Sequence, residues 1–271
     1  SYCYATGALQ CASLAGGLVA INNAGSCNAS FWDVQTSGMA ESDGGKGLAT
    51  AQMTQVRNYQ NAGWANTDWV MFEGSYPRLA WEGTGAPPIP APEPLALAGS
   101  GTAYDPYRIT TAEQLAGLSW NANALNAHYA LQADLDCAGL LLYPIGDSDQ
   151  HAFTGVFDGQ GHVLRNVSVN QPYGTAVGLF GALGQGGEIR NLGLDNISVI
   201  GRSRVGALVG HIDGGALVNC HMTGTITGSD NCSYVGGLAG YVNKGTLVDC
   251  YADGAVSGGA HIGDMSSYGW H

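Results

Sequence analysis

The stretch VGALVGHIDGGALVNCHMTGTITG (residues 205–228) is followed six residues later by VGGLAGYVNKGTLVDCYADGAVSG (residues 235–258). Within each copy apolar residues alternate with small or polar ones, which indicates strands with one buried face. Short strands that recur at a period of ~30 residues are typical of a solenoid, where each coil must present the same face to the next. We therefore predict an all-β fold, a parallel β-helix or β-solenoid with coils of ~30 residues.

Aligning the copies on the Leu of the Gly-Gly-Leu turn predicts three ladders of equivalent side chains. The first forms a repeat core of Leu18, Leu179, Leu208 and Leu238. A second inward position follows nine or ten residues later, at Ile189, Leu217 and Leu247, with Cys27 in the first copy. Two residues further on, a turn ladder is expected from Asn191, Asn219 and Asp249.

Cys220 and Cys250 occupy the same position on successive coils. Stacked neighbours ~4.8 Å apart fall within the Cα range of a disulfide, so this pair is either a disulfide or a ladder of buried thiols. Cys3 extends the ladder, because SYCYATGAL at the start of the chain matches VDCYADGAV around Cys250. The seven cysteines form no CxxC pair, and the pairing of Cys11, Cys27 and Cys232 stays open.

The repeats resemble a known family. VGLFG, VGALVG and VGGLAG resemble the GLUG motif of large bacterial surface proteins, including adhesins similar to filamentous haemagglutinin. GSGTAYDPYRITTAEQLAGLS, HYALQADLDC, YPIG and FTGVFDGQGHVLRNVSV resemble the segment that precedes such repeats, and ASFWDVQTSGMAESDGGKGLATAQM with AGWANTDWVMFEGSYPRLAW resembles the segment that ends them. The resemblance covers nearly all of the chain outside a proline-rich stretch, and it implies a β-helical, secreted or surface-displayed protein.

The order of these segments is unexpected, since the closing segment comes first. Residues 1–82 are predicted to be the Trp-rich end of one solenoid, and 83–100, which hold five of the nine prolines, a semi-rigid linker. Residues 101–169 are the leading segment of a second solenoid, and 170–271 its GLUG-type coils. Leucines at helical spacing predict one short capping helix over 112–125, which shields open strand edges.

The two ends of the chain are complementary in pattern. The final segment is a degenerate copy with Met265 in the place of Leu238, and if Ser1 followed His271, Cys3 would come nine residues after Met265 rather than twelve. We expect the Ser1 end and the His271 end to complete one solenoid head-to-tail, in a tandem array or by stacking of separate copies. A head-to-tail contact that does not close generates a filament.

Composition excludes several classes of function. Lys and Arg number nine against 21 Asp and Glu, for a net charge of −12, so the chain offers no basic stripe for nucleic acid. No apolar run approaches the ~20 residues that span a bilayer. Polarity through Gly, Asn, Ser and Thr with only 11% charged residues favours an extracellular or cell-surface fibre over a cytosolic enzyme.

Carboxylates in the leading segment are the candidates for chemistry. Asp134 and Asp136 share one strand face and suit a glycosidase pair or a calcium site, or they end a strand by bonding a turn. Asp147, Asp149 and His151 lie in a polar loop that lacks the rest of a calcium loop.

FDGQGH is expected to be a tight turn in which Gly159 and Gly161 supply positive φ, and His162 has no nucleophile context. Four Asn-X-Ser sequons, at Asn28, Asn166, Asn196 and Asn231, are interpreted as turn residues rather than glycan acceptors. The aromatic residues of the closing segment form either a sugar-stacking surface or, as we prefer, a cap core; they are Trp32, Trp64, Trp69, Tyr76 and Trp81.

The sequence thus predicts a non-enzymatic extracellular structural or adhesive fibre protein, without cofactor, metal or catalytic residues. Its partners are copies of itself and a surface glycan or protein, bound by avidity. One alternative is a carbohydrate-active β-helix enzyme, a polysaccharide lyase or glycosidase, with carboxylates or a carboxylate and Lys or Arg in one groove. The other is a calcium-stabilised binding module that melts on chelation.

Overall fold

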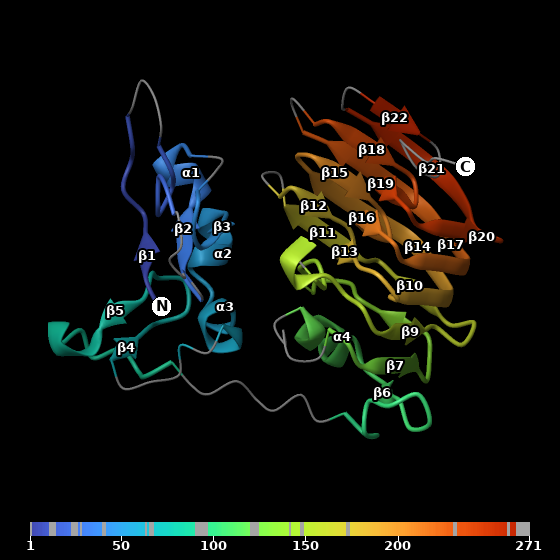
Figure 1. Cartoon of the computed structure of the whole chain (residues 1–271). Coiled ribbons are helices and arrows are strands. Elements are labelled where there is room, and N and C mark those ends of the chain that lie inside the picture. The colour runs from blue at the N-terminus through green and yellow to red at the C-terminus, as the bar shows by residue number, and fades with distance from the viewer. Residues whose placement is uncertain are drawn as a thin grey trace. The chain divides into compact units, whose positions relative to one another are not determined.

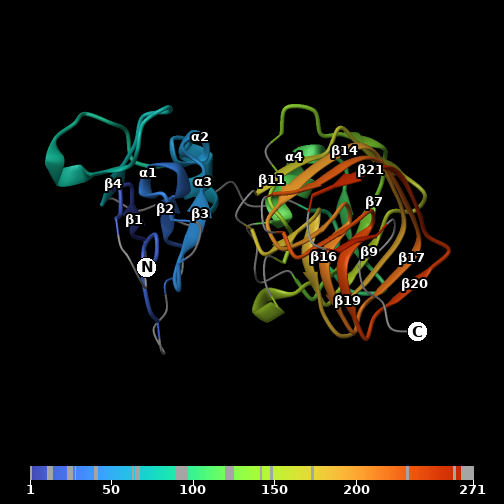
Figure 2. The same cartoon turned by 90° about the horizontal axis from the view of Figure 1, so that it is seen from above.

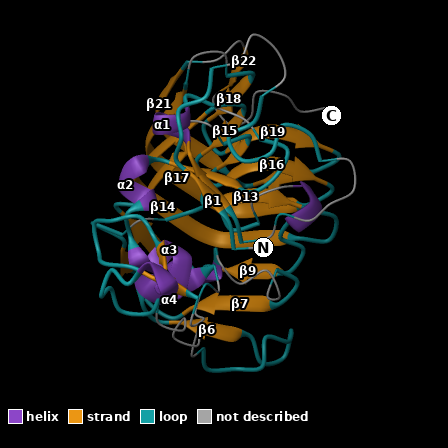
Figure 3. Cartoon of the chain, turned by 90° about the vertical axis from the view of Figure 1, so that its left-hand side faces the viewer, coloured by secondary structure: helices purple, strands orange, loops and turns teal. Residues whose placement is uncertain are grey.

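The computed structural model describes residues 2–10, 15–22, 27, 29–39, 42–62, 64, 68–89, 97–119, 125–140, 142–146, 149–171, 174–229, 232–258 and 261–263. The chain divides into two compact units, Ser1–Pro94 and Leu95–His271. The division falls within the proline-rich stretch, of which residues 90–96 lie outside the described part. Taken over both units, strands outnumber helical segments (Figure 3).

The second unit is a parallel β-solenoid whose coils stack from β6 at one end to β22 at the other (Figures 1 and 2). One sheet runs in the order β20-β17-β14-β9-β7-β6, a second β12-β15-β18-β22, and a third β13-β16-β19. The strands of the leading coils are β6 (Tyr107–Ile109), β7 (His128–Leu131), β8 (Leu135–Asp136), β9 (Val156–Asp158), β10 (Val163–Arg165) and β11 (Ser168–Gln171). Those of the repeats are β12 (Ala176–Val177), β13 (Phe180–Leu183), β14 (Glu188–Gly201), β15 (Arg204–Gly206), β16 (Val209–Asp213), β17 (Ala216–Gly228), β18 (Tyr234–Gly236), β19 (Ala239–Asn243), β20 (Thr246–Val248), β21 (Tyr251–Ser257) and β22 (His261–Gly263).

Coil stacking follows the sequence repeat residue by residue. Ile189 pairs with Leu217 and Leu217 with Leu247, so residues 28 and 30 apart in the chain are neighbours in the sheet. Val205 pairs with Val235, and Val235 with Ile262. The apolar residues of these strands share one continuous interior, which explains why the coils cannot fold singly.

The glycines of the GLUG motif are required by the corner between β15 and β16 and by the equivalent corner between β18 and β19. A Cβ added to Gly210 would lie 2.3 Å from the Val177 backbone nitrogen of the preceding coil. The equivalent atom on Gly240 would lie 2.3 Å from the Val205 nitrogen. The motif therefore spaces its glycines where backbones of successive coils approach most closely.

The β6 end of the solenoid is covered. The backbone N–H of Arg108 donates to the Ala98 carbonyl at 2.8 Å, in an antiparallel bridge along the outer edge of β6. Helix α4 (Ala112–Leu118), N-capped by Thr111, packs Leu115 and Leu118 into the core at this end. The helix is shorter than the predicted 112–125: it ends at Leu118, and Leu125 lies in a turn, while residues 120–124 are outside the described part.

The first unit carries a smaller parallel sheet, in the order β1 (Tyr4–Ala5), β2 (Phe31–Asp33) and β3 (Lys46–Leu48). An antiparallel pair, β4 (Trp69–Val70) and β5 (Arg78–Leu79), and the 3₁₀ turn η1 (Ala80–Glu82) follow. Three short helices were not predicted from the sequence: α1 (Val34–Ser37), α2 (Thr50–Met53) and α3 (Val56–Asn61). Asp33 caps α1 by accepting hydrogen bonds from the backbone of Gln35 and Thr36.

Candidate functional site: ladders, a polar corner and an open coil

The predicted core ladder lies inside the second unit. Leu179, Leu208 and Leu238 are at most 1% exposed, and the backbone N–H of Leu208 donates to the Leu238 carbonyl at 3.0 Å. Ile189 and Leu217 are fully buried, whereas Leu247 is only partly buried because no described strand covers its coil. Leu18 belongs to the first unit, where it is partly buried and its N–H donates to Ser42.

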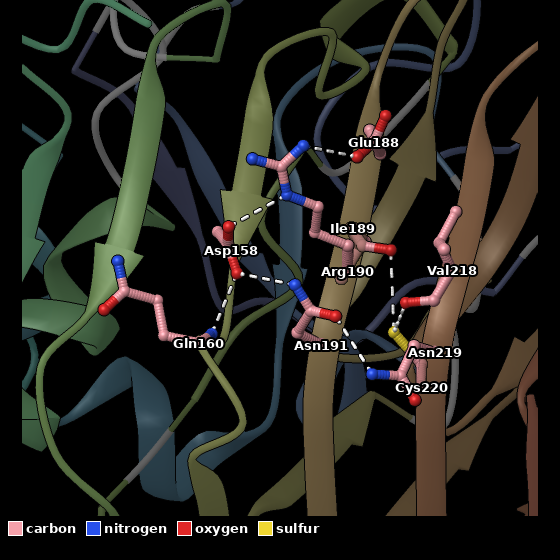
Figure 4. A network of polar contacts seen from close by, with 9 residues as sticks. All are labelled: Asp158, Gln160, Glu188, Ile189, Arg190, Asn191, Val218, Asn219 and Cys220. Atoms are coloured by element: carbon pink, nitrogen blue, oxygen red, sulfur yellow. Dashed lines mark hydrogen bonds and ion pairs between the residues drawn. The ribbon is translucent and has the colours of Figure 1, made fainter. Parts of the chain in front are cut away.

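The predicted turn residues adopt left-handed backbone conformations, which Asn and Asp tolerate best. The φ angles of Asn191, Asn219 and Asp249 are 51°, 51° and 53°. The Asn219 side-chain amide donates to the Asn191 oxygen at 2.9 Å, and the Asn191 amide donates to Asp158 at 3.1 Å (Figure 4). The ladder thus joins three successive coils through side chains as well as backbone.

Asp158 is the centre of a larger polar network on this face (Figure 4). Arg190 donates to Asp158 at 2.9 Å and to Glu188 at 2.9 Å, and the Gln160 backbone N–H donates to the other Asp158 oxygen. Burial alone would raise the pKa of Asp158, but these hydrogen bonds and the Arg190 charge outweigh it and hold the pKa below its usual value. The carboxylate is a fixed acceptor that links coils.

Asp134 and Asp136, the candidate catalytic pair, are both committed to turn contacts. Asp134 accepts from the Val163 backbone N–H, from Arg165 at 3.0 Å, and lies 3.1 Å from His162 Nδ1. These contacts lower the pKa of Asp134, the backbone hydrogen bond being the largest cause. A glycosidase acid needs a raised pKa, so this carboxyl is poorly suited to protonate a leaving group.

Asp136 starts a second amide ladder. It accepts from Asn166 at 2.8 Å, and Asn196 donates to Asn166 at 2.7 Å. The side-chain nitrogens of two of the four sequons are therefore engaged in coil-to-coil bonds. The sequons at Asn28 and Asn231 lie outside the described residues.

The turn containing His162 differs in one detail from expectation. Positive φ occurs at Gln160 (52°) and Gly161 (82°), not at Gly159. Gly159 is needed for another reason, since a Cβ there would lie 2.4 Å from the Asn191 carbonyl oxygen. His162 contributes to the turn through the contact of its ring with Asp134.

A polar corner between β15 and β16 was missed by sequence reasoning. Asp149, in the 3₁₀ turn η3 (Asp149–His151), lies 2.6 Å from His211 Nδ1, and Arg204 lies 3.1 Å from Asp149 and 2.7 Å from the same His211 nitrogen. His211 is 7% exposed. The contact joins residues 62 apart in sequence, which no local spacing could have indicated.

Aromatic rings continue this corner onto the later coils. Tyr241 packs at a tilt against His211 with ring centroids 5.4 Å apart, Tyr234 lies 5.0 Å from Tyr241, and His261 stacks on Tyr234 at 5.2 Å. The arrangement follows from register, because Arg204 pairs with Tyr234 and His211 with Tyr241. Tyr234 and Tyr241 are half-buried and His261 is exposed, so these three rings form a strip that suits contact with another surface.

In the described part of the chain, no three His, Cys, Asp or Glu side chains gather closely enough to hold an ion. Asp149 is directed to His211 and Arg204, and Asp147 lies outside the described residues. Among the described residues, no helix has the length and apolarity to cross a membrane.

The closing-segment aromatics are mostly internal. Trp64 is fully buried and Trp32 is 6% exposed, and Tyr4 stacks on Tyr76 with the rings 6.1 Å apart. Trp69 packs against Trp64 at 4.7 Å. The core interpretation is wrong for Trp81, which is 80% exposed in the middle of η1.

Cys220 and Cys250 are thiols rather than a disulfide, and so are Cys3, Cys27, Cys137 and Cys232. Cys220 is 1% exposed, Cys250 is partly buried, and Cys3 is exposed. Cys11 lies outside the described residues.

The fold defines a β-solenoid protein built of parallel coils. Its coils carry the GLUG motif, whose family model matches residues 201–227 and 231–257, the copies around Leu208 and Leu238. The chain is 36% identical over 143 residues to halomucin of Haloquadratum walsbyi. The matched segment covers 49% of this chain and 2% of that protein. It is also 36% identical over 122 residues to a protein of Evansella cellulosilytica named as a Gly-rich membrane protein, covering 42% of this chain and 14% of the relative.

The chain therefore spans only a small part of these relatives. Among solved structures, it is similar to a Bacteroides ovatus protein whose crystal structure is named for an immunoglobulin A1 protease. The TM-score is 0.46 at 24% identity, over 61% of this chain and 64% of that chain.

Proposed function

We propose that this protein is a non-enzymatic structural and adhesive fibre component, displayed outside the cell, which lengthens by head-to-tail stacking of solenoid ends. The observation that carries the proposal is the contrast between the two ends of the second unit. The β6 end is covered by residue Ala98 and helix α4, whereas β20, β21 and β22 have no outer partner among the described strands.

The coil formed by β20, β21 and β22, which we call the open coil, carries apolar side chains at positions that are buried in the coils below. Leu247, Ala252 and Val256 are only partly buried, although they pack on the core, and Ile262 is 55% exposed. A sheet edge of this kind recruits another strand, because its unpaired backbone groups and apolar inward face gain partners. Another solenoid coil is the natural occupant.

The start of the chain supplies a matching coil. SYCYATGAL repeats VDCYADGAV, and Tyr4 and Ala5 already form strand β1, which pairs in parallel with β2. Tyr4 and Tyr251, and likewise Cys3 and Cys250, are equivalent in this alignment. The outer edge of β1 stacked on β21 would continue the ladder of one copy into the next, whether the copies are separate or linked in one chain.

An adhesive role is supported by the side faces and by the relatives. Repetition of one surface along a fibre multiplies weak contacts by avidity. The strip of Tyr234, Tyr241 and His261 is the surface we assign to a glycan or protein partner. Similarity to halomucin and to a Gly-rich membrane protein supports display at the cell surface. Against the alternative of a carbohydrate-active enzyme stand the lowered pKa values of Asp134, Asp136, Asp149 and Asp158, which disfavour a carboxylic acid at neutral pH.

Negative-stain electron microscopy at neutral pH, with the mass measured under denaturing conditions, tests the proposal. We expect filaments that dissociate into 27.8 kDa chains on denaturation if copies stack non-covalently. Val256→Lys places a charge on the stacking face and should abolish filaments, while Ser257→Lys, on the exposed face of the same strand, should leave them intact. Short isolated rods from the unaltered protein would contradict head-to-tail growth and lead to polysaccharide digestion assays.

A further inference from the structure

The two stacked thiols near the open coil form a chemically distinct pair. Cys220 lies in β17 and Cys250 between β20 and β21, and the flanking pairs Leu217–Leu247 and His221–Tyr251 place them on adjacent strands. Strands in a sheet are about 4.8 Å apart, within the Cα separation that a disulfide spans.

Each sulfur is held in the same local environment. Cys220 Sγ lies 3.4 Å from the Val218 carbonyl oxygen and 3.5 Å from that of Ile189 on the coil below. Cys250 Sγ lies 3.2 Å from the Val248 oxygen and 3.6 Å from that of Leu217. The two thiols are close enough to perturb each other's pKa.

The pair is asymmetric. The hydrogen bond from Cys220 lowers the pKa of Cys250 to about 7, whereas the hydrogen bond to Cys250 and then burial raise the pKa of Cys220. The lowered pKa of Cys250 favours the thiolate on the outer, partly buried sulfur, and the raised pKa of Cys220 keeps the proton on the buried sulfur. The thiolate is the reactive form of cysteine, so the accessible member of the pair is also the nucleophile.

We propose that Cys220 and Cys250 are a redox site, which closes to a disulfide by exchange with a small-molecule disulfide and so staples the open coil to the coil beneath it. The Cys250 thiolate first attacks the small disulfide, forming a mixed disulfide and releasing one small thiolate. That thiolate, through solvent, takes the proton of Cys220, whose sulfur then attacks Cys250 Sγ and releases the second small-molecule sulfur as a thiolate. The small disulfide is reduced by two electrons, and the two cysteines are oxidised.

The geometry of the stacked strands makes this disulfide readily reversible. A disulfide prefers Cβ atoms about 3.5–4.5 Å apart, slightly closer than the roughly 4.8 Å spacing of stacked strands. Closing the bond draws the two coils together against their backbone ladder, and strained disulfides are more easily reduced. The site therefore responds to the redox state of the surroundings wherever the coil that carries Cys250 is not covered by a stacked copy.

The test uses the full chain treated with oxidised glutathione, followed by alkylation and non-reducing peptide mass spectrometry. We expect a peptide pair linked between Cys220 and Cys250, with the buried Cys232 and Cys137 remaining reduced. Hydrogen exchange of residues 246–257 should slow by roughly tenfold or more on oxidation, because the staple removes the local opening of the last coil. Dithiothreitol should restore the original exchange.

Variants separate the two chemical steps. Cys220→Ser should stop at the mixed disulfide and accumulate one glutathione on Cys250, and Cys250→Ser should leave Cys220 unreacted. Cys232→Ser is the matched control, a buried thiol whose sulfur lies 2.9 Å from the Ser203 carbonyl, and it should leave the Cys220–Cys250 link unchanged.

Three outcomes overturn the proposal. The unaltered protein could accumulate glutathione on Cys250 without a cross-link, Cys250 could fail to react, or the oxidised product could be a dimer joining Cys250 to Cys3 of a second copy. The last result would place the disulfide at a junction between copies instead.

Discussion

The coil that contains β17 and the coil that contains β20 and β21 share one repeat pattern but differ in environment. Leu217 is fully buried and Leu247 only partly, and Met222 and Ile226 are buried whereas their partners Ala252 and Val256 are only partly so. The inward positions are equivalent in register and apolar character. What differs is whether another described coil lies above them.

The comparison shows that more of the stability of this fold comes from the interfaces between coils than from the individual coils. A repeat contributes little until its neighbour covers its apolar face and accepts its hydrogen bonds. Matched substitutions in the two coils measure this difference directly.

The largest effect is expected from truncating the inward leucines. Leu217→Ala removes a fully buried side chain between two coils and should lower the free energy of unfolding by about 3–4 kcal/mol. Leu247→Ala at the open coil should cost about 1 kcal/mol, since much of its side chain is not yet withdrawn from water. Guanidinium denaturation followed by circular dichroism, with hydrogen exchange to localise the change, measures both.

Equal losses for the two variants would contradict the comparison. If the losses are unequal in dilute protein but converge in filaments, the open coil is covered in the assembled state. The concentration series thus extends the comparison to the proposed stacking.

Sequence alone was sufficient for the repeat because the information is local and repeated. The alternation of apolar residues and the spacing of Leu208 and Leu238 predict strands, period and register. The helical spacing of the leucines likewise predicts where α4 begins, although not that it ends at Leu118.

The contacts that the sequence alone could not predict are those set by where loops cross the solenoid. Asp149 reaches His211 only because the chain between β8 and β9 passes the corner of a later coil. Trp81 has the same residue type as the buried Trp64, yet it lies within a 3₁₀ turn and is exposed. Neither outcome has a periodic signal, because each is decided by a contact between segments far apart in the chain.

Substitutions in the turn ladder should give the second largest loss in the free energy of unfolding. Asn191→Ala loses hydrogen bonds to Asp158 and from Asn219 and forces alanine into a φ of 51°, so we expect a loss of about 2–3 kcal/mol. Asp249→Ala, at the same position on the open coil, should lose about 1 kcal/mol through its φ of 53°. Denaturant midpoints of the two variants compare the positions.

Asn191→Gly separates the two contributions. Glycine relieves the left-handed strain but cannot make the hydrogen bonds, so it should recover about 1 kcal/mol and no more. Full recovery would show that the amide ladder between Asp158, Asn191 and Asn219 adds no stability.

The smallest effect should be a loss of stability at low pH, and it should arise in the covered coils. The pKa of Asp158 is lower in the folded protein than its usual 3.8, so its contribution to stability is present above pH 3.8 and is lost as the pH falls through the folded value. Partial exposure of Arg190 and Asp158 screens their interaction, so this loss should be smaller than that of Asn191→Ala. Hydrogen exchange below pH 4 should therefore accelerate first around β9 and β14, relative to a reference peptide at each pH, and Asp158→Asn should flatten that response. Acceleration confined to β20–β22 would instead mean that the open coil controls acid unfolding, and that the polar network of the inner coils is not the element that senses pH.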